Sequence, residues 1–266
     1  EQQFFQESIN KFLEDNVTVD ALKAYRTDEN KVLTKTVYNG LNELGLSSLI
    51  VPEAFGGLGL DSLFAISVSE SLGKGVAPYP FIGSFLIAPF LIDQLGNESQ
   101  KEKYLPGIAT GENRFGVALS EITGRRIDSS IEYSKQRLNG SSLFVMDDID
   151  CTHYLIVDSD AGVHIIDASN VNLERVHLNT VDVTSFVSEL IFNGIETEVL
   201  SNDSDNIEIV NQAIDLGRIA LAANTLGAAQ CMLDQSIDYA KERKQFGRQI
   251  GSFQAVKHMC AQMASD

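Results

Sequence analysis

The stretch of the chain with the clearest potential for chemistry is residues 239–259, YAKERKQFGRQIGSFQAVKHM. It gathers basic side chains in a protein of formal net charge −17 at pH 7; they are Lys241, Arg243, Lys244, Arg248, Lys257 and His258. An arginine guanidinium offers a planar fork of N–H donors, which fits a phosphate or a carboxylate better than an ammonium does. The cluster therefore predicts a local anion-binding site. A solvated helix end is the alternative, because cations favour the C-terminal end of a helix dipole.

The overall charge balance argues against one class of partner. The chain has 20 Lys and Arg against 37 Asp and Glu, whereas an unspecific grip on nucleic acid or an anionic membrane needs a basic surface. Its three cysteines, Cys151, Cys231 and Cys260, stand far apart without CxxC spacing, which supports neither a disulfide framework nor a zinc site. No apolar run has membrane-spanning length and polar residues follow Glu1. We therefore expect a cytoplasmic protein with reduced thiols that binds neither nucleic acid nor membrane.

The elements that must position the basic cluster begin with helices. In EQQFFQESINKFLEDN, residues 1–16, apolar side chains recur at helical spacing: Phe4, Phe5, Ile9, Phe12 and Leu13. A second helical pattern stops at Gly45, and the glycine-rich loop VPEAFGGLGLD follows. The apolar stretch FIGSFLIAPFLIDQLG predicts a buried helix that is interrupted near Pro89. These patterns predict an N-terminal helical domain, residues 1–112.

From about residue 113 the period of the pattern changes from helical to alternating. Short β-branched runs bounded by turn residues occur in RFGVALSE, HYLIVDS, GVHIIDAS and SELIFNG. Because no helical patterns lie between them, they predict a middle antiparallel β-domain, residues 113–205, built as a sandwich or a barrel. His153, His164 and His177 lie in or near these strands without ligand spacing, so we expect structural roles for them and no metal site.

A long helix is expected to begin at about Ile207. Its centre, GRIALAANTLGAAQCMLDQSIDYAKER, is rich in Ala and Gly, which lets helices approach closely and predicts the middle of a bundle. The final stretch, FQAVKHMCAQMASD, keeps its apolar residues on one side and has no stop signal. Either the chain is a fragment, or another subunit covers that apolar side. The fold class is therefore α+β, with an incomplete C-terminal helical domain, residues 206–266.

Three stretches give the chain a resemblance to a known family. GLSSLIVPEAFGGLGLD resembles a loop in the N-terminal helical domain of acyl-CoA dehydrogenases, and FGVALSE resembles the start of their middle β-domain. YAKERKQFGRQIGSFQAVKHM resembles their C-terminal signature, which requires Arg243, Gln245, Phe246, Gly247 and Gln254 at fixed spacing. The resemblance covers almost the whole chain. It implies a three-domain flavoprotein that forms dimers or tetramers and removes two hydrogens across the α and β carbons of an acyl-CoA thioester.

The resemblance also implies a role for the basic cluster. In the family, the arginine at the position of Arg243 reaches across the subunit interface to the pyrophosphate of the neighbour's FAD. The residues that match Phe246 and Gln254 contact the same FAD. Together with Gln245 from the same motif, these are our candidate cofactor-binding residues. The basic cluster would then hold a cofactor anion that belongs to another subunit.

One flavin-contacting segment of the family is altered in this chain. Where the family has Thr-Glu-x-x-Ala-Gly-Ser-Asp, this sequence has SEITGRRID. Ser120 and Glu121 keep the beginning, whereas Arg125 and Arg126 stand where Gly and Ser are expected. Because small residues let the backbone approach the flavin, large side chains at these positions are expected to fill or close the pocket.

A second flavin-contacting segment is altered as well. The family has Trp, then Ile, then Ser or Thr, and the hydroxyl bonds to the N5 edge of the flavin. This chain has Phe144, Val145 and Met146 at the corresponding place and contains no Trp. Met146 cannot donate the hydrogen bond that a hydroxyl would make.

The catalytic base of the family has no clear counterpart. The reaction needs a carboxylate placed to take the α proton. In one branch of the family it is a Glu directly before an Arg on the first C-terminal helix, but here Gly217 precedes Arg218. In other branches it lies further along, past residue 266. Asp215 and Glu242 are on the same helix, but charged helix residues are usually solvated, so we assign no catalytic residue.

These losses indicate a subunit that binds no FAD in its own β-domain and supplies Arg243, Phe246 and Gln254 to the FAD of a partner. Some bacterial acyl-CoA dehydrogenases for steroid-derived CoA thioesters are heterotetramers of this kind. LGKGVAPYPFIGSFLIAP and GRQIGSFQAVKHMCAQM resemble that subgroup. The implied partners are a homologous subunit, an acyl-CoA substrate and an electron-transfer flavoprotein. Two alternatives are a structural or regulatory homologue without cofactor, and a self-sufficient homo-oligomeric dehydrogenase.

Overall fold

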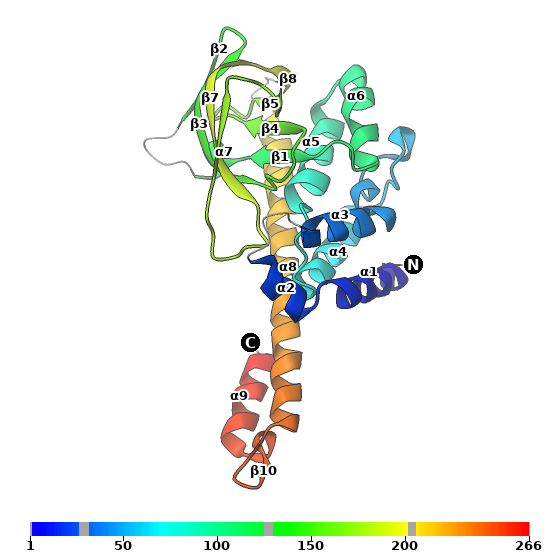
Figure 1. The fold of residues 1–266 in the computed structure, drawn as a ribbon. Coiled ribbons are helices and arrows are strands. Elements are labelled where there is room, and N and C mark those ends of the chain that lie inside the picture. Colours follow the sequence, from blue (N-terminus) through cyan, green and yellow to red (C-terminus); the bar gives the residue numbers. More distant parts are fainter. Residues whose placement is uncertain (1, 27–31, 125–129, 202–205, 266) are drawn as a thin grey trace.

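The computed structural model describes residues 2–26, 32–124, 130–201 and 206–265, and it confirms the predicted order of helices, then strands, then helices (Figure 1). The helices of the described ranges are α1 (Gln2–Asn16), α2 (Val19–Tyr25), α3 (Val32–Glu43), α4 (Ser62–Lys74), α5 (Ala88–Leu95), α6 (Glu98–Ala109), α7 (Ser120–Thr123), α8 (Ile207–Glu242) and α9 (Gln254–Ser265). Short 3-10 turns, η1 (Leu46–Ser48), η2 (Glu53–Phe55) and η5 (Ile250–Ser252), join some of them.

The N-terminal helices bury a narrower apolar face than the sequence predicted. Ile9 and Leu13 of α1 are fully buried, whereas Phe4 is 74% exposed near the start of the helix. Helices α4 and α8 cross at close range, as the Ala and Gly content of α8 predicted. A Cβ at Gly73 would lie 1.8 Å from the backbone oxygen of Asn224, and one at Gly227 would lie 2.0 Å from that of Glu70. Two glycines therefore set the distance between these helices.

The buried helical stretch after α4 is interrupted near Pro89, as the sequence predicted. Residues Ile82–Ile87 form a π-helix, η3, and α5 begins at Ala88. Pro89 follows η3 in continuous helical backbone and cannot donate to a carbonyl of the preceding turn. The change of winding therefore lies just before Pro89. π-Helical turns of this kind often occur beside functional sites.

The middle of the chain forms one sheet with strand order β6-β7-β3-β1-β4-β5-β8, in which β2 pairs with β3. Its strands are β1 (Phe115–Ala118), β2 (Ile131–Ser134), β3 (Arg137–Met146), β4 (His153–Val157), β5 (Val163–Asp167), β6 (Leu173–His177), β7 (Val187–Glu196) and β8 (Glu198–Ser201). Four of them, β1, β4, β5 and β7, were predicted. The pairing is antiparallel as expected, with one correction: β1 and β4 run parallel, with Val117 opposite Leu155.

Helix α8 joins the body of the molecule to a protruding arm (Figure 1). Its first half is buried at several positions, while after Gly227 only Ala240 is buried among the described side chains of the helix. A tight hairpin, β9 (Lys244–Gln245) and β10 (Arg248–Gln249), leads into α9, which runs back along α8. Large apolar side chains stay exposed on this arm, among them Leu226, Met232, Tyr239 and Met259. No helix in the described ranges has the length and hydropathy needed to cross a membrane.

Candidate functional site

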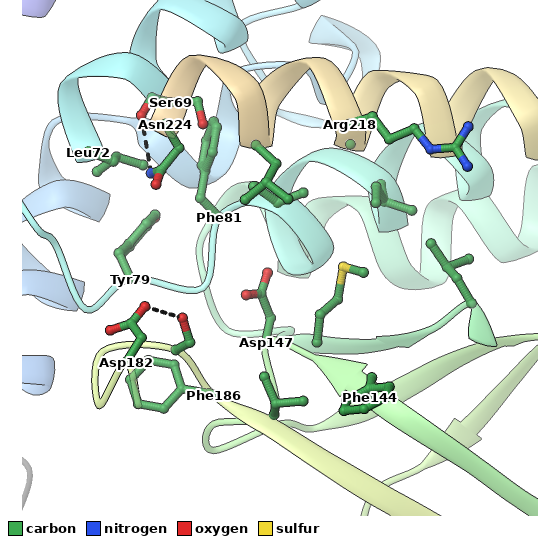
Figure 2. A pocket seen from close by; sticks show the side chains of 18 of the residues that line it. Ser69, Leu72, Tyr79, Phe81, Phe144, Asp147, Asp182, Phe186, Arg218 and Asn224 are labelled. Carbon is green, nitrogen blue, oxygen red and sulfur yellow. Dashed lines mark hydrogen bonds between the residues drawn. The ribbon is translucent and has the colours of Figure 1, made fainter. Parts of the chain in front are cut away.

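The three parts of the chain meet at a cavity of about 530 Å³ (Figure 2). Its walls come from α4 and the segment that leads into η3, from the end of β1 with α7, from the end of β3, from the loop before β7, and from the first half of α8. Most of the lining is apolar and includes Leu72, Phe81, Ile87, Leu119, Phe186 and Ile214. A concave, mostly apolar pocket with a few polar groups is the usual form of a small-molecule site.

The end of β3 brings one of the altered flavin-contacting segments to this cavity. Phe144 and Met146 both line it, whereas Val145 between them is fully buried in the core on the other side of the strand. The pairing of β3 with β7 shifts register between Ser142 and Val145, and Phe144 has a φ of 58°. This is an unusual backbone conformation for a bulky residue. The bulge turns the aromatic ring of Phe144 outward, where it is 64% exposed.

The other altered segment lies beside it. Leu119, Ser120 and Thr123 line the cavity, and the Ser120 hydroxyl lies 2.8 Å from that of Ser142 on β3. Glu121 is buried in the same short helix. Arg125 and Arg126, which were expected to fill the pocket, lie outside the described residues. The first part of this segment therefore lines the cavity. That Arg125 and Arg126 fill the pocket stays a prediction.

Asp147, which follows β3, carries the most perturbed carboxylate of the cavity wall. Its Oδ2 accepts hydrogen bonds from the backbone N–H groups of Gly83 and Ser84, at 2.5 and 3.0 Å, at the start of η3. Burial raises the pKa of Asp147 to about 6, against the opposing effect of these two hydrogen bonds. A Cβ on Gly83 would lie 3.0 Å from Oδ2 and 3.0 Å from Met146. Glycine at position 83 therefore lets the carboxylate approach the backbone.

Helix α8 forms the wall opposite the sheet. Gly217 and Arg218 both line the cavity, so the position at which one branch of the family carries its base does face this space. It offers no carboxylate, and a Cβ there would lie 2.8 Å from Ile87. The Arg218 guanidinium points along α8 in Figure 2 and forms an exposed ion pair with Asp215 at 3.0 Å. Glu242, the other carboxylate considered, is exposed at the far end of α8.

Several cavity residues were missed by sequence reasoning. Tyr79, Phe81, Asp147, Asp182 and Asn224 line the space together with the predicted positions. Asp147 directly follows β3, but Asp is a common turn residue after a strand and gives no local signal of a cavity wall. The others come from a loop, a turn and the middle of a long helix, where no local pattern separates a lining residue from a core residue.

The four candidate cofactor-binding residues lie together, away from this cavity. Arg243 is the C-cap residue directly after α8, Gln245 and Phe246 lie in the hairpin, and Gln254 begins α9. Phe246 has a φ of 52° and Gly247 of 78°, the pattern of a tight hairpin turn with positive φ at both central residues. Phe246 is 92% exposed and packs edge-on against Phe253, at 6.2 Å between ring centroids.

The guanidinium of Arg243 is available for binding. The backbone oxygen of Arg243 accepts a hydrogen bond from Ile250, but its side chain makes no hydrogen bond or ion pair with any described residue. Its neighbour Arg248 is instead stacked on the Phe253 ring, at 4.1 Å. At about 1.5 Å per residue, roughly 28 Å of helix separates Arg243 from Asn224, the last cavity-lining residue of α8. The hairpin cannot reach the cavity of its own chain.

Two histidines of the sheet, His153 and His164, have protein partners. His164 is fully buried, and its Nε2 lies 2.8 Å from the carboxylate of Asp158. His153 contacts the Thr152 hydroxyl through Nδ1 and stacks on Phe115. These contacts stabilise the sheet and leave both rings away from the cavity.

Comparison with known proteins places this geometry in a family. The model of the acyl-CoA dehydrogenase N-terminal domain matches residues 1–112, and that of the acyl-CoA dehydrogenase C-terminal domain matches residues 207–266. The chain therefore belongs to the acyl-CoA dehydrogenase family. The mitochondrial isovaleryl-CoA dehydrogenase of Arabidopsis thaliana is 28% identical over 283 residues, which cover 97% of this chain and 68% of that protein. An acyl-CoA dehydrogenase of Bacillus subtilis is 32% identical over 253 residues, covering 83% of this chain and 64% of that protein.

Solved structures share the fold over nearly the whole chain. The Tcur3481–Tcur3483 steroid ACAD variant superposes with a TM-score of 0.83 at 28% identity, over 98% of this chain and 72% of that one. The ChsE4–ChsE5 complex of Mycobacterium tuberculosis gives a TM-score of 0.85 at 21% identity, over 98% and 72%. This chain thus spans about two thirds to three quarters of the length of the proteins it matches. Complexes between two different subunits occur among these structural neighbours.

Proposed function

We propose that this chain is a subunit of an FAD-dependent acyl-CoA dehydrogenase that contributes to the FAD site of a homologous partner. The observation that carries the proposal is the position of Arg243, Gln245, Phe246 and Gln254. All four are exposed and lie on or beside one hairpin, which is too far along α8 to serve the cavity of the same chain. If these residues bind a cofactor, it belongs to another subunit.

The cavity of this chain fits a flavin poorly. The side chain of Met146 has no hydrogen-bond donor at the place where the family has a hydroxyl. Asp147 and Asp182 add two carboxylates to the lining, and negative charge opposes the reduction of a bound flavin. The apolar lining and the volume instead suit part of an organic ligand. We therefore derive no catalytic step through a flavin in this cavity.

The hairpin residues, by contrast, have the chemistry that a dinucleotide needs. The Arg243 guanidinium can donate two parallel hydrogen bonds to a pyrophosphate, and the exposed Phe246 ring can pack on a planar group. The amides of Gln245 and Gln254 can both donate and accept. FAD, when bound, accepts the hydride that leaves the β carbon of the acyl thioester. This chain's residues bind and orient the cofactor in that reaction, and we assign the proton-abstracting carboxylate to none of them.

The substrate class, the acyl group and the electron acceptor that we propose are those of the family and of similar proteins. An acyl-CoA thioester is the substrate class that the family members' names give. The steroid ACAD among the structural neighbours supports a bulky, steroid-derived acyl group for this subunit's complex. An electron-transfer flavoprotein is the proposed electron acceptor.

The experiment is a charge reversal at Arg243 in the assembled complex. Arg243→Glu should release FAD, because the substitution replaces two phosphate-binding hydrogen bonds with repulsion. Assembly should remain intact. Lys241→Glu is the matched control, since Lys241 lies on the same arm and, among the described residues, forms an ion pair only with Asp238, at 3.3 Å between exposed side chains. The readout is flavin absorbance per mole of complex, together with the mass of the complex. Unchanged flavin content in Arg243→Glu would overturn the proposal.

A further inference from the structure

The sequence contains three Asn-Gly steps, which begin at Asn39, Asn139 and Asn193. In such a step the backbone nitrogen of the glycine can attack the Cγ carbon of the asparagine side chain, because glycine has no Cβ that restricts the approach. All three asparagines are exposed, so access of water does not distinguish them. The backbone around each glycine therefore decides which step reacts.

The first step lies inside a helix. Gly40 belongs to α3 (Val32–Glu43), where backbone N–H groups donate to carbonyl groups of the preceding turn. A Cβ at Gly40 would lie 2.2 Å from the ring of Phe12 on α1, so the two helices pack closely at this point. Cyclisation at Asn39 would break both the helical hydrogen bond and this contact.

The second step is held from both sides of β3. Gly140 lies opposite Ile131 of β2 and opposite Phe192 of β7. A Cβ at Gly140 would lie 1.8 Å from the backbone oxygen of Ser130, so the neighbouring chain leaves no room for the backbone to rotate. The strands must open locally before Asn139 can react.

The third step lies at a β-bulge between β3 and β7. The register passes from Leu138 opposite Ile195 to Asn139 opposite Asn193, which leaves Gly194 without an opposite residue on β3. The pairing of β7 with β6 ends one residue before Asn193. The extra residue of a bulge is left out of the ladder, so among the described strands neither neighbour pairs with Gly194.

The space around Gly194 is open as well. Its φ of 71° is the left-handed conformation that glycine adopts in one class of bulge. The atoms nearest to a Cβ at this position would be side-chain atoms of Asn139 and Arg137, at 3.8 and 3.9 Å. The backbone N–H of Asn193 donates to Asn172, but the two reacting atoms are Cγ of Asn193 and the nitrogen of Gly194. These two atoms can therefore approach each other without opening the ladder.

We propose that Asn193 is a site of spontaneous deamidation through a cyclic imide. The nitrogen of Gly194 forms a bond to Cγ of Asn193, and the bond from Cγ to the side-chain nitrogen breaks. The proton of the Gly194 N–H passes through water to the departing nitrogen, which leaves as ammonia. Water then opens the imide at either of its carbonyl carbons and gives aspartate or isoaspartate. Water is the only other reactant.

The products change the charge and the backbone at the bulge. Arg137 donates to the backbone oxygen of Gly194 at 3.0 Å and forms an exposed ion pair with Glu196. A carboxylate at position 193 would compete with Glu196 for this guanidinium. Isoaspartate also carries the chain through its β carbon, which lengthens β7 at the place where one extra residue sets its register with β3.

The test follows the three steps separately in the purified chain at mildly alkaline pH, both folded and unfolded in urea. Trypsin leaves Asn39, Asn139 and Asn193 on different peptides, and tandem mass spectrometry measures deamidation on each. In urea the three rates should be similar. In the folded chain Asn193 should keep most of its urea rate, whereas Asn39 and Asn139 should slow by roughly tenfold or more, because their backbones must first open.

The identity of the product tests the cyclic imide. Both aspartate and isoaspartate should form at position 193, and labelling with an isoaspartyl methyltransferase detects the second. Asn193→Gln is the control, because a glutamine side chain would have to form a larger ring. It should abolish deamidation on this peptide and leave the rates at Asn39 and Asn139 unchanged.

The inference is overturned if folding protects Asn193 as strongly as Asn139, or if Asn39 or Asn139 reacts as fast as Asn193 in the folded chain. Aspartate without isoaspartate would exclude the cyclic imide. Deamidation that persists on the same peptide in Asn193→Gln would assign the reaction to another asparagine. The comparison of folded with unfolded chain needs no variant, so a poorly folded variant cannot hide the result.

Discussion

At the scale of single residues, Asp147 shows how one carboxylate can define a site. Two backbone N–H groups at the start of η3 stabilise its charged form, and burial disfavours that form more strongly. The net result is a pKa raised from 3.8 to about 6. The position therefore costs stability whenever the carboxylate is ionised, which is typical of a group kept for binding.

This cost predicts a specific pH dependence. Because the native state holds the proton of Asp147 more tightly than the unfolded chain, ionised Asp147 lowers the free energy of unfolding above pH 6, and the loss disappears as the pH falls toward 3.8. Asp147→Asn keeps an oxygen that can accept from Gly83 and Ser84 but carries no charge. We expect it to be more stable by about 1–3 kcal/mol above pH 7 and equal to the unaltered protein near pH 4.

Urea unfolding at a series of pH values measures this difference. Asp182→Asn serves as the comparison, since hydrogen bonds from Ser185 and Thr184 outweigh burial and lower the pKa of Asp182. That variant should lose stability above its pKa. An Asp147→Asn variant that is less stable than the unaltered protein at neutral pH would contradict the account of Asp147.

At the scale of elements, the crossing of α4 and α8 positions the cavity. The backbone oxygens of Asn224 and Glu70 occupy the places where side chains of Gly73 and Gly227 would begin. Asn224 also lines the cavity and donates to Ser69 on α4. The close approach therefore fixes the wall that faces the sheet.

Gly73→Ala tests this arrangement. The added Cβ would lie 1.8 Å from the Asn224 oxygen, so the helices must move apart. We expect a loss of about 1–3 kcal/mol in the free energy of unfolding, measured by thermal and urea unfolding. Lys74→Ala, at the neighbouring exposed position, should change stability little. If Gly73→Ala keeps the Tm of the unaltered protein, the glycine contact does not set the helix spacing.

The strands and helices differ in how well local sequence patterns predicted them. The strands β4 and β5 are β-branched and almost wholly buried, so their pattern was readable. Strand β6 is largely exposed and reads LERVH, which no hydrophobic pattern distinguishes from a loop, and its place is fixed by pairing with β7. The π-helical winding of η3 depends on contacts with β1, β3 and α8, which a local pattern does not contain. The parallel pairing of β1 with β4 is likewise a property of the whole sheet.

The residues of the candidate site were likewise predictable only where they belong to one contiguous sequence motif. The candidates on the hairpin came from one contiguous motif and lie together in the structure. The cavity is assembled from segments far apart in sequence, and the resemblance located Phe144, Met146 and Gly217 on its wall. Asp147 was missed, because its character depends on two N–H groups that arrive from η3.

At the scale of the whole molecule, the main exposed apolar surface lies on the arm formed by α8 and α9. Exposed apolar side chains on α8, including Leu226 and Met232, continue past the body of the molecule. Apolar surface of this kind is typical of a subunit interface. The basic hairpin lies at the end of the same arm, on a chain of formal net charge −17. A partner that covers the arm would meet Arg243 at its edge, so assembly would be coupled to the cofactor binding that we propose for this residue.

The most direct measurement of this central claim is the visible spectrum and mass of the chain, purified alone and with a homologous acyl-CoA dehydrogenase subunit. The account predicts a colourless chain alone and a yellow complex that contains one flavin for each pair of different subunits. A chain that binds flavin and is yellow by itself would contradict it, because the cavity with Met146 and Asp147 would then hold the cofactor without a partner.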